Sequence, residues 1–102
     1  MDITNVVKEG MANIFKGKEG VGGKLYLTTD KVIHKAHKMN VQRGTVEINL
    51  EDIESIDVYN NKVLGLPIKN GLQIKDKSGS VYKFVVYKRE EWVQAIEEQL
   101  RM

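Results

Sequence analysis

Apolar and polar residues alternate along most of this chain, with the period of two that is typical of strands with one buried face. Residues 45–50 show the pattern clearly, because Val46, Ile48 and Leu50 alternate with polar residues. Short polar or glycine-containing segments separate the alternating stretches and predict antiparallel connections. The expected strands cover residues 6–15, with an interruption at Gly10, and residues 25–28, 31–36, 45–50, 53–59, 71–76 and 81–87.

The period changes to that of a helix only after the last expected strand. Over residues 89–101, Trp92, Val93, Ile96 and Leu100 fall on one apolar stripe. No Ser, Thr, Asp or Asn stands before this segment as an N-cap, so other contacts must satisfy its first N–H groups. Because the stripe follows the last strand almost directly, we expect the helix to close one open end of a small β-sandwich.

Three segments of the chain follow the pattern of one family. Residues 22–40 read GGKLYLTTDKVIHKAHKMN, with paired glycines, alternating aliphatic residues, a short polar turn and a Val-Ile pair. Residues 48–57 read INLEDIESID, a strand, an acidic turn and a second strand. Together with the helix that carries Trp92, these segments resemble the GRAM domain, a member of the pleckstrin-homology-like superfold. The resemblance runs from about Ala12 to Leu100.

This resemblance implies a fold and a general role. The fold class is mainly β: a pleckstrin-homology-like antiparallel β-sandwich, or partly open barrel, of six to seven strands capped by one C-terminal α-helix. A chain of 102 residues suffices for one such domain, so we expect residues 1–102 to form a single GRAM-like unit. The role that the resemblance implies is that of a non-enzymatic binding module, and it leaves the ligand open.

The cysteine count, the two histidines and the sequence motifs of the chain argue against catalysis and metal binding. The chain has no Cys, which excludes disulfides, thiolate metal sites and thiol nucleophiles, and it lacks P-loop, HExxH and GxSxG motifs. His34 and His37 lie three residues apart on an expected strand and therefore point to opposite faces. We expect His34 to be a half-buried core residue with one nitrogen hydrogen-bonded. The prediction is no catalytic residue, no metal and no cofactor.

The start of the chain and its hydropathy predict a compartment. The first ten residues, MDITNVVKEG, lack the basic and apolar regions of a signal peptide, and no apolar run approaches the length of a membrane span. With no Cys, the sequence predicts a cytoplasmic protein, at most peripheral to the inner face of the membrane.

The charges are unevenly placed although the net charge is only +2. Residues 16–43 hold seven basic residues against two acidic ones, and residues 47–57 hold five acidic residues and no basic one. The basic segment can form one basic face or a mixed solvated surface, and both remain open. Few aromatic residues are interleaved with it, so nucleic-acid binding is not expected. Many pleckstrin-homology domains hold anionic headgroups between their basic early strands, and the resemblance places the lipid-binding candidates at Lys16, Lys18, Lys24, Lys31, Lys35 and Lys38.

Residues 60–70, NNKVLGLPIKN, are unusually apolar for a connection between strands. They hold the only Pro of the chain and four candidate contact residues, Val63, Leu64, Leu66 and Ile68. The favoured interpretation is a loop that folds back over an open end of the sandwich. The alternative is a contact site for a protein partner, a membrane or a second copy in a homodimer, and a sheet edge could serve a protein partner in the same way. The two predicted functions are therefore association with an anionic lipid surface and protein interaction or self-association.

Overall fold

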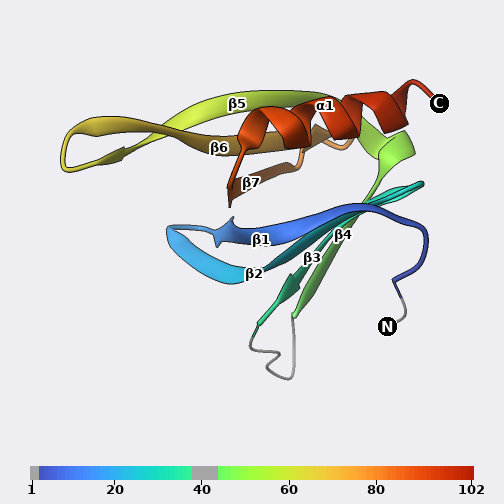
Figure 1. The fold of residues 1–102 in the computed structure, drawn as a ribbon, viewed down its shortest axis with the longest axis horizontal. Helices are drawn as coiled ribbons and strands as arrows, with labels where there is room; N and C mark the ends of the chain where they lie inside the picture. The colour runs from blue at the N-terminus through green and yellow to red at the C-terminus, as the bar shows by residue number, and fades with distance from the viewer. Residues whose placement is uncertain (1–2, 38–43) are drawn as a thin grey trace.

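The computed structural model describes residues 3–37 and 44–102, which form strands, one short 3₁₀ helix (η1) and one α-helix (Figure 1). Turns of two to four residues join most of the elements, as antiparallel pairing of neighbours requires. The elements in chain order are β1 (Val6–Lys16), β2 (Glu19–Thr28), β3 (Lys31–Ala36), β4 (Thr45–Asn49), η1 (Leu50–Asp52), β5 (Ile53–Val63), β6 (Leu66–Asp76), β7 (Val81–Val86) and α1 (Arg89–Leu100).

The seven strands form one antiparallel sheet in the order β4-β3-β2-β1-β7-β6-β5. β1 pairs with β2 from end to end, but it pairs with β7 only over residues 12–14. At this short joint the sheet curls into a half-barrel, which leaves β4 and β5 as its two edges (Figure 1). The predicted architecture, a mainly β, antiparallel and partly open barrel with one C-terminal helix, is confirmed.

The core lies on the concave side of the curled sheet, where alternate residues of the strands meet. Leu25 and Leu27 of β2 are fully buried, and so are Leu72 of β6 and Phe84 of β7, which stand opposite one another in the β6–β7 pair. The period-two pattern of the sequence thus identified the inward residues, because neighbouring side chains on a strand point to opposite faces.

Helix α1 lies along β5 and β6 and covers part of this core (Figure 1). Trp92 and Ile96 are buried, while Leu100 at the end of the predicted stripe is partly exposed. The expected interruption at Gly10 is wrong, because β1 continues through this residue and pairs it with Leu25. A Cβ at Gly10 would lie 3.4 Å from Cζ2 of Trp92, an ordinary contact distance, so the indole ring of the helix lies directly over this part of β1.

The expected fold-back loop over residues 60–70 is also wrong. β5 continues to Val63 and β6 begins at Leu66, so this segment is the end of a long β-hairpin that projects beyond the body of the domain (Figure 1). The pair Lys62–Pro67 belongs to the ladder, and Leu64 and Gly65 form the turn. The apolar composition of this segment suggested packing on the sandwich. Its backbone N–H and C=O groups instead form hydrogen bonds between β5 and β6, so the segment needs no contact with the sandwich.

His34 makes the one hydrogen bond that the sequence predicts, but it is almost fully buried rather than half-buried. Nε2 of His34 lies 2.9 Å from the carbonyl oxygen of Ala12, and the imidazole packs beside Phe84 with ring centroids 6.2 Å apart. A carbonyl oxygen can only accept a hydrogen bond, so Nε2 carries the proton and donates it. His34 is therefore a structural residue of the core, with a hydrogen bond to β1 and a packing contact with Phe84.

Candidate functional site

Two of the candidate lysines stand side by side on the convex face of the sheet. Lys24 of β2 and Lys35 of β3 are register partners, so their side chains leave the same face of the sheet. Lys24 already has partners within the domain: its Nζ forms an ion pair with Glu9 Oε1 at 2.8 Å and lies 5.6 Å from the ring centre of Tyr26. The hydrogen bond to Glu9 raises the pKa of Lys24. Within the part of the chain that the structure describes, no ion pair involves Lys35.

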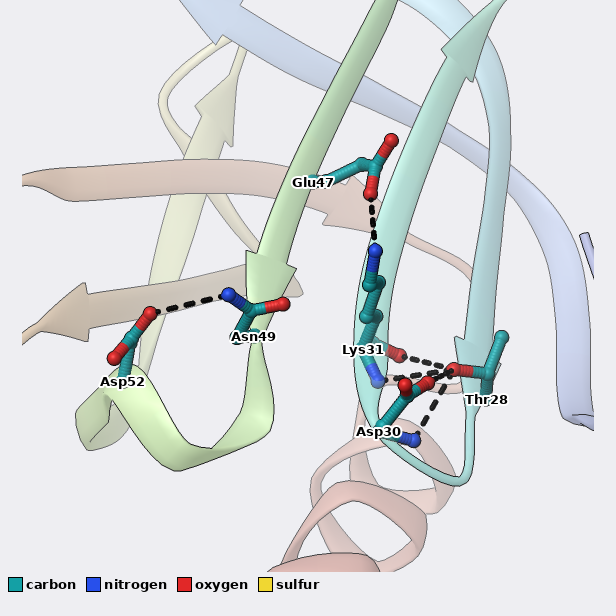
Figure 2. A network of polar contacts seen from close by, with 6 residues as sticks. All are labelled: Thr28, Asp30, Lys31, Glu47, Asn49 and Asp52. Carbon is teal, nitrogen blue, oxygen red and sulfur yellow. Dashed lines mark hydrogen bonds and ion pairs between the residues drawn. The ribbon is translucent and has the colours of Figure 1, made fainter. Parts of the chain in front are cut away.

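Lys31 lies at the other end of β3, in a polar network around the β2–β3 turn (Figure 2). Its Nζ contacts Glu47 Oε1 at 2.8 Å, and this hydrogen bond raises its pKa. The hydroxyl oxygen of Thr28 accepts hydrogen bonds from the backbone N–H groups of Asp30 and Lys31, at 3.2 and 2.9 Å, and closes the turn. Lys31 is thus paired with an acidic neighbour and is separated from Lys24 and Lys35 along the strand.

Lys16 and Lys18 flank the turn between β1 and β2. Gly17 has a positive φ of 66° and allows this tight reversal, which leaves both lysines exposed at the tip. Among the ion pairs of the described residues, none includes Lys18. Lys38, the sixth candidate, lies outside the described residues. The cations best placed for an anionic surface are therefore Lys18, in the β1–β2 turn, and Lys35.

The four apolar candidates occupy the tip of the β5–β6 hairpin. Val63 ends β5 opposite Leu66, the first residue of β6. The exposed fraction rises toward the turn, from 39% at Ile68 through 66% at Leu66 to 98% at Leu64. Three apolar side chains therefore stand in solvent at one projecting point, which is unusual for a small monomeric domain.

The base of this hairpin is held by Arg89, a residue that the sequence analysis did not single out. Arg89 is buried at the start of α1, and its Nη1 donates hydrogen bonds to the carbonyl oxygen of Tyr59 at 2.7 Å and to Asn60 Oδ1 at 3.1 Å. A longer contact of 3.5 Å reaches the carbonyl oxygen of Gly71 on β6. An arginine as the first residue of a helix without an N-cap was the only sequence signal for this role.

The basic turn and the apolar tip point to the same end of the molecule. In Figure 1 the β1–β2 turn and the β5–β6 tip both lie at the left of the view, and the C-terminus lies at the right. A single flat surface approached from that end could meet both features. The arrangement combines cations and exposed apolar groups.

A groove of the described surface lies away from both of these features. It has a volume of about 470 Å³ and runs between the β2–β3 turn, η1 and the C-terminal end of α1. Its lining includes Asp30, Glu51 and Leu100 but no Lys or Arg. An anionic ligand would be repelled there, so the groove is not a site for a phosphate or a lipid headgroup.

Residues 3–37 and 44–102 contain no group of three or more His, Asp or Glu side chains arranged to hold a metal ion. They also contain no helix whose length and apolar character would allow it to cross a bilayer.

Comparison with known proteins supports the fold. No protein-family model matches the chain, and no curated protein matches it. Among solved structures, the C-terminal domain of an unknown protein from Leishmania infantum superposes with a TM-score of 0.76 at 13% identity, over 95% of this chain and 84% of that one. The Vps36 N-terminal PH domain gives a TM-score of 0.70 at 17% identity, over 94% and 78% of the two chains. The N-terminal PH domain of human ARAP2 gives 0.71 at 14% identity, over 99% and 84%.

These similarities define the fold class. The chain has a pleckstrin-homology-like fold across nearly its whole length, which agrees with the strand order and the C-terminal helix. Identities this low carry the architecture alone, because one fold hosts many functions.

Proposed function

We propose that this chain is a non-enzymatic, GRAM-like binding module that associates with an anionic membrane surface. The contact surface consists of the lysines of the β1–β2 turn and of β3, which we call the basic end. The contact cations are Lys16, Lys18 and Lys35, with Lys38 beside them in the sequence. The observation that carries the proposal is that Lys18 and Lys35 have no acidic partner among the described ion pairs, whereas Lys24 and Lys31 do. A cation without an internal counter-charge is the one that gains most from an anionic surface.

The physical character of this association follows from the geometry. Exposed lysines on strands and turns attract anionic lipid mainly through long-range electrostatics, at about fivefold in affinity for each lysine near the surface. Neither of two grooves on the described surface, of about 470 and 190 Å³, is lined by Lys16, Lys18 or Lys35, so neither would let these lysines select one headgroup. The proposal is therefore weak, salt-sensitive binding to anionic bilayers in general. The likeness to GRAM domains is part of this proposal and rests on residues 22–40 and 48–57 and on the Trp92 helix.

Vesicle sedimentation tests the proposal. Wild-type protein should pellet with phosphatidylcholine vesicles that contain phosphatidylserine and should stay in solution with phosphatidylcholine alone. Lys18→Glu with Lys35→Glu should weaken pelleting at least about tenfold in about 0.1 M salt. The difference should shrink in about 1 M salt, where the screening length falls from about 10 Å to about 3 Å.

The matched control is Lys77→Glu, a charge reversal in the exposed β6–β7 turn. Far-ultraviolet circular dichroism should show that all three proteins are folded. Equal pelleting of the control and of the double variant would overturn the assignment of the basic end. Wild-type protein that ignores anionic vesicles in low salt would overturn the proposed function itself.

A further inference from the structure

The turn at the end of the β5–β6 hairpin holds a leucine where a leucine is disfavoured. Leu64 has φ = +52° and Gly65 has φ = +80°, and two successive positive φ values are the requirement of a type I′ hairpin turn. Asn-Gly is the common sequence for this turn, because a larger side chain is strained in the left-handed region. Leu64 is also 98% exposed. Neither backbone conformation nor core packing explains this residue, so a contact outside the domain is the remaining reason for it.

The residues below the turn make the hairpin amphipathic. Leu66 and Ile68 lie on one face of the hairpin, because they are two residues apart on β6. The other face carries two lysines. Lys69 lies there on β6, and Lys62 lies there on β5, where it pairs with Pro67. Residues 58–70 contain no Asp or Glu. In the described part of the chain neither of these two lysines forms an ion pair. The tip is therefore apolar at its end, with two cations behind it.

The hairpin is also held in one shape. Nδ2 of Asn61 donates a hydrogen bond of 2.7 Å across the strands to Oδ1 of Asn70. Below this pair, the guanidinium of Arg89 bonds the carbonyl of Tyr59 and ties the hairpin to the start of α1. A projection fixed in this way presents its apolar end without first losing much conformational entropy on binding.

We propose that the β5–β6 tip inserts into the interfacial region of an anionic bilayer, with Leu64 and Leu66 at the acyl-chain boundary and Lys62 and Lys69 among the headgroups. This inference rests on the proposed function and deepens it, because it adds an apolar anchor to the basic end. The tip lies toward the same end of the molecule as the β1–β2 turn and extends beyond it (Figure 1). Lysine side chains reach back to the headgroup level when neighbouring apolar residues are buried.

The charges favour a membrane over a second copy of the chain. Two tips packed together would bring four lysines close to one another with no acidic residue of the tip between them. A bilayer that contains anionic lipid instead supplies counter-charge at its headgroups and an apolar phase directly below them. A self-associated state is the alternative outcome of the test below.

The first variant, Leu64→Asn, removes the apolar end and supplies the residue that the turn prefers. Its thermal midpoint should be at least as high as that of the wild type, so reduced binding would not reflect misfolding. Pelleting with anionic vesicles should weaken about tenfold, and by a similar factor in low and in high salt, because burial of apolar surface is not screened. Unchanged pelleting of this variant, with wild-type protein binding well, would overturn the tip inference and leave the proposed function standing.

The second measurement locates the tip directly. Because the chain has no Cys, Leu64→Cys provides one labelling site for an environment-sensitive fluorophore, and Ser78→Cys in the β6–β7 turn is the matched control. On addition of anionic vesicles, the emission of the label at position 64 should shift to shorter wavelength and be quenched by lipids with a nitroxide on the acyl chain. The label at position 78 should report water throughout.

The remaining outcomes separate the two proposals. Vesicle pelleting with a label at position 64 that stays in water would overturn insertion alone. No pelleting of wild-type protein would overturn both proposals. A dimer of wild-type protein in light scattering that Leu64→Asn converts to a monomer, without a membrane signal, would replace insertion by self-association through the tip.

Discussion

At the scale of single residues, the position of His34 depends on a glycine in the neighbouring strand. A Cβ at Gly23 would lie 2.6 Å from Cε1 of His34 and would collide with the backbone of Lys35, so only glycine leaves room for the imidazole. The ring is thereby enclosed in the core with its Nε2 bonded to Ala12. Burial lowers the pKa of His34, and the charges of Lys16 and His37 add to this effect. The neutral form is the one that the fold accommodates.

This pKa shift predicts a loss of stability in weak acid. The unfolded chain protonates His34 near pH 6.5, whereas the folded protein resists protonation until a lower pH. The free energy of unfolding should therefore fall as pH drops below about 6.5, by at most about 1.4 kcal/mol per pH unit, and this group should contribute no slope above that pH. Urea denaturation at several pH values between about 7 and 5.5 measures the slope.

The variants that test the assignment are His34→Gln and His37→Gln. Glutamine at position 34 retains an amide donor for Ala12 and does not titrate, so this part of the slope should disappear. His37 is exposed, and its charge is a smaller cause of the lowered His34 pKa than burial is, so its replacement should leave most of the slope in place. A slope that survives in His34→Gln would show that another group causes it.

At the scale of elements, the side chain of Arg89 connects α1 to the β5–β6 hairpin through hydrogen bonds. The buried guanidinium of Arg89 bonds the carbonyl of Tyr59 and contacts that of Gly71, at the point where the register of the β5–β6 pair shifts. Its Nε also lies 3.0 Å from Glu90 Oε2. A long hairpin gains from a support of this kind, because the side chains of Leu64 and Leu66 at its end are largely exposed and contribute little packing.

We expect Arg89→Met to lower the free energy of unfolding by about 2–4 kcal/mol, since it leaves buried carbonyl groups without their charged donor. Urea denaturation measures this loss, with Arg101→Met at the exposed end of α1 as the matched control. The control should change stability by less than about 0.5 kcal/mol. A loss in Arg89→Met no greater than in the control would contradict the role of Arg89 as a brace.

At the scale of the whole molecule, the basic end and the apolar tip are separate features of one surface. They belong to different halves of the curled sheet, since β1, β2 and β3 carry the basic residues, and β5 and β6 carry the tip. In Figure 1 the β1–β2 turn and the β5–β6 tip lie toward the same side of the view, on either side of the short β1–β7 joint. Electrostatic attraction and apolar insertion should then act on the bilayer together.

This arrangement predicts additive effects on membrane binding. The triple variant Lys18→Glu, Lys35→Glu, Leu64→Asn should lose affinity for anionic vesicles by the product of the two separate factors, because distant groups act independently. Titration of vesicles against each protein at one salt concentration measures the three affinities. A triple variant that binds no more weakly than the double lysine variant would mean that the two features do not engage the membrane at the same time.

The sequence by itself determined the fold class, most strands, the helix and the core. Leu25, Phe84 and Trp92 could be placed inside because strand and helix periodicities are local properties of the chain. The apolar residues between Asn60 and Asn70 were recognised as exceptional by composition alone. Their role in the fold was misjudged, because composition does not show whether a segment pairs with itself or packs on the body.

Only the tertiary structure decided which of the candidate residues are available to a partner. Lys24 and Lys31 are neutralised because strand register brings Glu9 and Glu47 beside them, and register between strands is not visible in either strand alone. The projection of Leu64 likewise depends on Arg89, which reaches β5 across 30 positions of the sequence. Periodicity is a property of neighbouring residues, whereas charge pairing and exposure depend on segments that meet only after the sheet has curled.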